Sequence, residues 1–86
     1  MAVSNEWLLN WAKAQLESKG TEYVTLFECP TLTITFGRDG NEGGYDVEVD
    51  NIVGVALHTQ EDNQVSFYDA LRIAYWCKRL ALSIDP

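Results

Sequence analysis

The central part of the chain is rich in carboxylates that no basic residue offsets. Between Arg38 and Arg72 the sequence has no lysine or arginine, but it has eight acidic residues: Asp39, Glu42, Asp46, Glu48, Asp50, Glu61, Asp62 and Asp69. A concentration of one sign of charge destabilises the compact state through self-repulsion, and it attracts partners of the opposite sign. The chemistry that these residues could do is therefore the binding of a basic partner.

Three of these acids alternate with apolar residues in the run from Tyr45 to Asp50. On a β-strand this alternation places the acids on one face and the apolar residues on the other. The acids then stand in water roughly 7 Å apart, which is two residues of strand rise. We predict a solvated acidic sheet face that contacts a partner through Asp39, Glu42, Asp46, Glu48, Asp50, Glu61 and Asp62. The alternative is a face that is charged only for solubility.

The remaining reactive residues lack the neighbours that catalysis or metal binding needs. His58 is the only histidine, and no cysteine lies near it in the sequence, so we expect a surface histidine at a strand end. Cys29 and Cys77 fit no zinc spacing, and we expect two reduced thiols in or near the core. We therefore predict no catalytic residue, no cofactor and no metal, and a protein that is not an enzyme.

The segment from Asp39 to Asp50 superficially resembles the twelve-residue calcium loop of EF-hands. Asp39 stands at the first position, Asn41 at the third and Gly44 at the sixth. At the fifth position Gly43 has no side chain, and at the twelfth Asp50 replaces the bidentate glutamate. Because the flanks also read as strands, our interpretation is a hairpin tip without calcium.

Length and net charge limit the classes of protein to which this chain can belong. The 86 residues predict a single domain, residues 1–86, and the apolar fraction of 47% excludes disorder. A net charge of −7 repels nucleic acid and anionic membranes, so we predict direct contact with neither. Because the sequence shows no membrane-length apolar run and no signal-peptide pattern, we expect a cytoplasmic location in a bacterial or host cell.

Sequence patterns predict a helix, a β-meander and a second helix. The first helix is capped by Ser4 or Asn5 and ends at Gly20. Strands are predicted over 22–28, 31–36 and 45–49, with a glycine-rich loop over 37–44. A polar loop over 59–65 precedes the second helix, residues 67–82, with Ser66 and Asp69 as its capping box.

Matching alternation suggests how the strands pair. The even length of loop 37–44 lets three apolar pairs share one face: Phe36 with Tyr45, Ile34 with Val47, and Leu32 with Val49. After Asp50 the chain could make a two-residue turn or a three-residue loop. We choose the loop, because it buries valines together by pairing Val49 with Val53 and Val47 with Val55, and it leaves Gly54 and Ala56 on the acidic face.

These elements make an α+β fold: an antiparallel meander of three to four strands with the N- and C-terminal helices packed on one face. The order resembles the outline of the double-stranded-RNA-binding domain. That family needs a basic cluster at the start of its second helix, where this chain has Asp62, Ser66 and Asp69. RNA binding is therefore not implied.

Aromatic residues gather in both predicted helices as Trp7, Trp11, Tyr75 and Trp76. Trp76 falls on the polar stripe of the second helix. These residues either pack in the core or anchor a protein–protein interface, where tryptophan and tyrosine are enriched. We include Trp76 among the predicted partner-binding residues.

In size, acidity and lack of catalytic motifs the chain is similar to small inhibitors carried by phages and mobile elements, among them anti-CRISPR and anti-restriction proteins. Some of these occupy nucleic-acid sites on their targets. We predict a non-enzymatic inhibitor that docks its acidic face on a basic, nucleic-acid-binding protein surface and blocks it. The alternative is a structural or assembly subunit that forms a homodimer through its aromatic helix faces.

Overall fold

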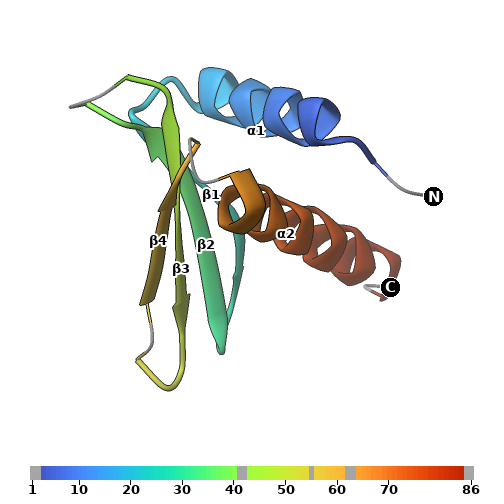
Figure 1. The fold of residues 1–86 in the computed structure, drawn as a ribbon. Helices are drawn as coiled ribbons and strands as arrows, with labels where there is room; N and C mark the ends of the chain where they lie inside the picture. Colours follow the sequence, from blue (N-terminus) through green and yellow to red (C-terminus); the bar gives the residue numbers. More distant parts are fainter. Residues whose placement is uncertain (1–2, 41–42, 55, 62–63, 85–86) are drawn as a thin grey trace.

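The chain forms two helices and one four-stranded antiparallel sheet. The computed structural model describes residues 3–40, 43–54, 56–61 and 64–84. The strand order is β1-β2-β3-β4, and both helices pack on the same face of the sheet (Figure 1). The predicted α+β meander with flanking helices is confirmed. The elements are α1 (Asn5–Lys19), β1 (Tyr23–Cys29), β2 (Leu32–Arg38), β3 (Tyr45–Asn51), β4 (Ala56–Gln60) and α2 (Gln64–Ile84).

The first helix has the ends that its sequence predicts. Ser4 is the N-cap, and its Oγ accepts a hydrogen bond of 3.1 Å from the backbone N–H of Trp7. Gly20 ends the helix with φ at 72°, a left-handed conformation that glycine adopts without a Cβ penalty. Its N–H donates to the Leu16 carbonyl, which satisfies one of the orphan acceptors of the last turn.

The core lies between the helices and one face of the sheet. A bulge in β1 at Leu26 breaks the simple alternation, so that Leu26 is buried and the next residue, Phe27, also packs against the core. The buried apolar side chains are Leu8, Ala12, Leu16, Val24, Leu26, Ile34, Phe36, Val47, Phe67, Ala70, Leu71 and Ala74.

The predicted pairing of β2 with β3 has the correct faces but the wrong register. Ile34 pairs with Val49 and Phe36 with Val47, two residues away from the predicted partners. Leu32 pairs with Asn51 instead of Val49. The loop is shorter than predicted because β2 continues through Gly37 and Arg38, and Arg38 donates a backbone hydrogen bond to Glu22. A shift of two residues leaves every side chain on its predicted face.

The predicted three-residue loop after Asp50 is also wrong. Val49 pairs with Leu57 and Val47 with Thr59, four residues beyond the predicted partners. The Asn51 side chain accepts the N–H of Val53 at 3.0 Å, and Gly54 has φ at 82°, so a wider turn forms. Val53 is 79% exposed instead of buried, and Val55 lies outside the described residues. Gly54 lies in this turn, whereas Ala56 pairs with Asp50 on the predicted acidic face.

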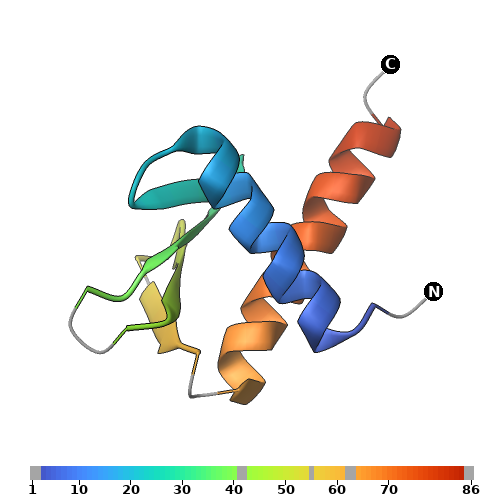
Figure 2. The same cartoon turned by 90° about the horizontal axis from the view of Figure 1, so that it is seen from above.

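The second helix begins earlier than its predicted capping box. It starts at Gln64, so that Ser66 lies inside its first turn and cannot be the N-cap. The predicted polar loop over 59–65 is shorter, because β4 runs to Gln60 and buries Thr59 beside Val47. Figure 2 shows α1 crossing α2, with the C-terminal part of α2 diverging from α1.

Thr59 generates a stability prediction. Its side chain is 3% exposed, and its hydroxyl oxygen has no hydrogen-bond partner within the described part of the chain. A buried polar group without a partner costs about 1–3 kcal/mol. We expect Thr59→Val to raise the free energy of unfolding by about 1 kcal/mol in urea denaturation. The same change at Thr33, on the opposite face, should have a smaller effect, and a destabilised Thr59→Val would contradict this reading.

Candidate functional site

The strand register arranges the outward side chains in three rows across the sheet, on the face opposite the helices. We call this surface the outer sheet face. Residues that pair across neighbouring strands share a face, so each row crosses all four strands. The rows are Tyr23–Gly37–Asp46–Gln60, Thr25–Thr35–Glu48–His58 and Glu28–Thr33–Asp50–Ala56.

Each row of the outer sheet face contains a carboxylate, and none contains lysine or arginine. The sequence prediction that Asp46, Glu48 and Asp50 share one face is therefore confirmed. Glu28 is a further acid that sequence reasoning missed. Simple alternation would place it on the core face with Val24, but the bulge at Leu26 moves it outward.

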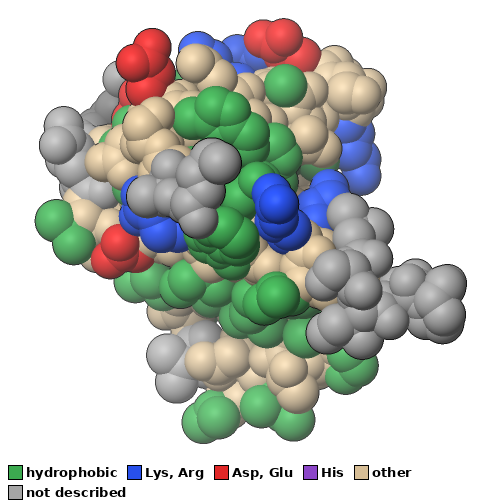
Figure 3. Space-filling model, turned by 90° about the vertical axis from the view of Figure 1, so that its right-hand side faces the viewer, with side chains coloured by type: hydrophobic (Ala, Val, Ile, Leu, Met, Phe, Trp, Pro, Cys, Tyr) green, Lys and Arg blue, Asp and Glu red, His purple; other side chains and the backbone are tan. Residues whose placement is uncertain are grey.

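Most of the positive charge lies on the other side of the molecule. The two helices contain five of the six basic residues, Lys13, Lys19, Arg72, Lys78 and Arg79. They contain only three of the thirteen acids, Glu6, Glu17 and Asp69. Seen from the helix side, hydrophobic side chains cover the middle of the surface with Lys and Arg beside them, and Asp and Glu lie toward the edges (Figure 3). The acidic outer sheet face is therefore a local feature.

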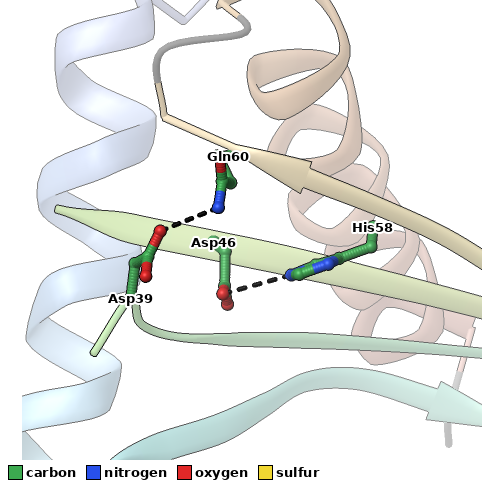
Figure 4. A network of polar contacts seen from close by, with 4 residues as sticks. All are labelled: Asp39, Asp46, His58 and Gln60. Carbon is green, nitrogen blue, oxygen red and sulfur yellow. Dashed lines mark hydrogen bonds and ion pairs between the residues drawn. The ribbon is translucent and has the colours of Figure 1, made fainter. Parts of the chain in front are cut away.

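Two polar contacts fix the orientation of acids at one end of this face (Figure 4). Nε2 of His58 lies 3.1 Å from Oδ2 of Asp46, which joins β4 to β3. The Gln60 amide donates a hydrogen bond of 2.8 Å to Asp39 in the β2–β3 loop. Among the described residues, neither Glu48 nor Asp50 forms an ion pair, and both are exposed. Together with Glu28, which is also exposed and forms no ion pair among the described residues, these carboxylates are the ones most available to a partner.

The same end of the face is hollowed. An open hollow of about 340 Å³ is lined by Glu22, Tyr23, Thr35, Gly37, Arg38, Asp46 and Glu48. Gly37 also lines the hollow, and a Cβ there would lie 3.0 Å from the Cβ of Tyr23, which is a tight contact. The Arg38 guanidinium lies 5.9 Å from the centre of the Tyr45 ring. It forms no ion pair with an acid in the described parts of the chain.

Two more of the acids predicted to bind a partner, Asp39 and Glu61, lie just beyond the ends of strands β2 and β4. Glu61 follows β4, and its backbone N–H bonds to Tyr45. Burial, and then the negative charge of Glu61, raise the pKa of Tyr68 above its ordinary value. Glu42 and Asp62 lie outside the described residues. The described members of the predicted acidic set are therefore divided between the sheet face and the segments that directly follow β2 and β4.

Trp76 lies on α2, away from the outer sheet face. It is half-buried, its ring meets Tyr75 edge-on at 5.3 Å, and the Arg79 guanidinium lies 5.7 Å from its centre. Because the helices cover the opposite face of the sheet, Trp76 and the carboxylate rows cannot contact one flat partner surface together. The predicted partner-binding residues thus belong to two surfaces.

Neither metal-site geometry nor comparison with known proteins indicates what this chain binds. Within the described ranges, no three His, Cys, Asp or Glu residues come together in a way that could hold a metal ion. The EF-hand-like segment is flanked by strands β2 and β3, and Cys29 and Cys77 are free thiols. No helix in the described part of the chain is long and apolar enough to cross a membrane. Comparison with known proteins finds no matching family model, no matching curated protein and no matching solved structure.

Cys29 generates a pH prediction. Its Sγ lies 3.3 Å from the hydroxyl of Thr31, and hydrogen bonding to the Thr31 side chain and then to its backbone lowers the pKa of the thiol. The thiolate is the reactive form, so Thr31→Val should raise this pKa and move the midpoint of alkylation to higher pH. The rate would be measured against pH in a Cys77→Ser background. Thr33→Val is the control, and an unshifted midpoint for Thr31→Val would contradict the assignment.

Proposed function

We propose that this chain is a non-enzymatic binding protein whose outer sheet face docks on a basic surface of another protein. The observation that carries the proposal is the set of carboxylates on that face, Glu28, Asp46, Glu48 and Asp50, without a lysine or arginine in any row. Exposed like charges destabilise the free protein, and a cationic partner relieves their repulsion. The face is also free of helices, so a partner could reach all three rows.

The hollow gives this surface a place for a cationic side chain. Glu22, Asp46 and Glu48 supply three carboxylates to its lining against one cation, Arg38, whose guanidinium lies by the Tyr45 ring. Tyr23, which is 63% exposed, supplies an aromatic ring. A lysine or arginine inserted there would gain charge-assisted hydrogen bonds from the carboxylates and a cation–π contact from the ring. This combination favours a partner with a protruding basic side chain over one that is only diffusely positive.

A nucleic-acid-binding protein is the partner class that fits best. Such proteins concentrate lysine and arginine on one surface to contact phosphates. A net charge of −7 would keep the chain itself away from nucleic acid. By occupying the basic surface, the chain would block it, as inhibitors of the phage-borne kind do.

The test compares two variants that remove the same number of charges from opposite faces. Glu22→Gln, Asp46→Asn and Glu48→Gln together remove the three carboxylates of the hollow, while Glu6→Gln, Glu17→Gln and Asp69→Asn remove the three carboxylates of the helices. Binding to an immobilised nona-arginine peptide would be measured by biolayer interferometry. We expect the first variant to bind about tenfold more weakly, mainly through slower association, because charge steering acts on the on-rate.

The helix-side variant should lose much less affinity, and wild-type binding should weaken steeply as salt rises. Circular dichroism would check that both variants fold. Equal losses for the two variants would show that only net charge matters, and would refute a specific role for the outer sheet face.

A second candidate function, self-association, is favoured by the exposed side of α2. Val65, Ile73 and Leu80 are 74%, 49% and 57% exposed, and Ile73, Trp76 and Leu80 follow the three- and four-residue spacing of one helical stripe. An apolar stripe on the solvent side of a helix is typical of a helix–helix interface. A homodimer through this stripe would leave both outer sheet faces free.

Sedimentation equilibrium at about 100 μM protein, well above a micromolar dissociation constant, tests this candidate. We expect the wild type to be a dimer and Ile73→Glu to be a monomer, because a charge would be buried in the interface. Val53→Glu, at a turn residue that is also largely exposed, is the matched control and should remain dimeric. A monomeric wild type would exclude self-association at this concentration.

A further inference from the structure

A second hollow lies between the two helices, on the side of the molecule away from the carboxylate rows. Its volume is about 240 Å³, and its lining residues are Trp11, Gln15, Tyr75, Lys78 and Arg79. The rings of Trp11 and Tyr75 meet edge-on at 5.4 Å, where the helices contact each other. Beyond this contact the C-terminal part of α2 diverges from α1 (Figure 2), which opens a space with aromatic walls.

Two neighbouring cations line this space, and one of them is held in place. Nη1 of Arg79 donates a hydrogen bond of 3.0 Å to the Tyr75 hydroxyl, and the guanidinium lies 5.7 Å from the centre of the Trp76 ring. Arginine carries five N–H donors, so this orientation leaves others for a ligand. Among the described residues, no carboxylate lines the hollow and no ion pair involves Lys78 or Arg79.

Within the described ranges the hollow has no acid to balance its two cations, although the chain has thirteen acids and only six basic residues. Adjacent like charges without a counter-ion repel each other, and an acid from the surplus could have neutralised them. Four of the acids lie on the outer sheet face instead. A guanidinium and an ammonium beside aromatic walls can recognise an anion through charge-assisted hydrogen bonds and its apolar body through ring contacts.

We propose that this hollow binds a carboxylate carried on an aromatic or apolar body. Arg79 and Lys78 would contact the carboxylate, and Trp11 and Tyr75 would pack against the body. The hollow, with a volume of about 240 Å³, has room for an aromatic ring together with a carboxylate. The carboxylate could belong to a free small acid or to the C-terminal residue of a partner chain. The site does not depend on the proposed role of the outer sheet face.

The experiment is a titration of ¹⁵N-labelled protein with phenylacetate, followed by NMR. We expect saturable shifts of the Trp11 indole N–H, and phenylacetate should bind about tenfold more tightly than neutral phenylacetamide or inorganic phosphate. Phenylacetamide keeps the ring without the charge, and phosphate keeps the charge without the ring.

An acetylated tripeptide that ends in phenylalanine would be compared with its C-terminal amide. Tighter binding of the acid peptide than of phenylacetate assigns the site to a partner's chain end, and weaker binding assigns it to a free acid.

Arg79→Gln and Lys78→Gln should each weaken phenylacetate binding about fivefold or more, because each removes one charged contact. Lys19→Gln removes a cation of α1 outside the hollow and should change nothing. If Arg79→Gln disturbs the fold by losing its bond to Tyr75, Lys78→Gln still tests the proposal. The variant neutralised in the sheet hollow should bind phenylacetate at least as tightly as the wild type, which separates this site from the proposed function. The proposal is refuted by unsaturable shifts, or by equal binding of phenylacetate and phenylacetamide.

Discussion

The strict alternation of β3 determines how the whole molecule is arranged. Val47 is buried on the face of the sheet that the helices cover, while its neighbour Glu48 is exposed on the other side of the strand. A strand with this pattern can be covered on one face only, because burying its carboxylates without partners would cost several kcal/mol per charge. Both helices must therefore pack on the same side of the sheet. The uncovered face of the sheet is therefore a consequence of the alternation in β3.

One-sided packing also separates the charges. The helices carry most of the basic residues on their solvent sides, and the sheet carries its acids on the opposite side. Neighbouring side chains reduce the repulsion between the carboxylates of this face. Thr33 and Thr35 separate Asp50 and Glu48 from β1, and His58 contacts Asp46. The acidic face can therefore remain solvated in the free protein and still be strongly attractive to a cationic surface.

The sequence predicted which face of the sheet each side chain occupies, but it did not predict the register of the strands. Both hairpin predictions were wrong by an even number of residues, and an even shift keeps each side chain on its face. Register depends on loop contacts such as the bond from Asn51 to Val53, which alternation does not reveal. The same limit applies to the site. The acids of β3 were found, but Glu28 depends on a bulge, and the His58 contact depends on the register of β4.

Opposite charges on opposite faces restrict how the chain can approach a target. A basic surface attracts the outer sheet face and repels the helix side, where Lys78 and Arg79 stand without acidic partners among the described residues. The approach is therefore oriented before contact, which raises the fraction of productive encounters. In the complex that we propose, the hollow between α1 and α2 would face away from the target. A ligand or partner chain end could then occupy it without competing for the carboxylates, because the two surfaces share no lining residue.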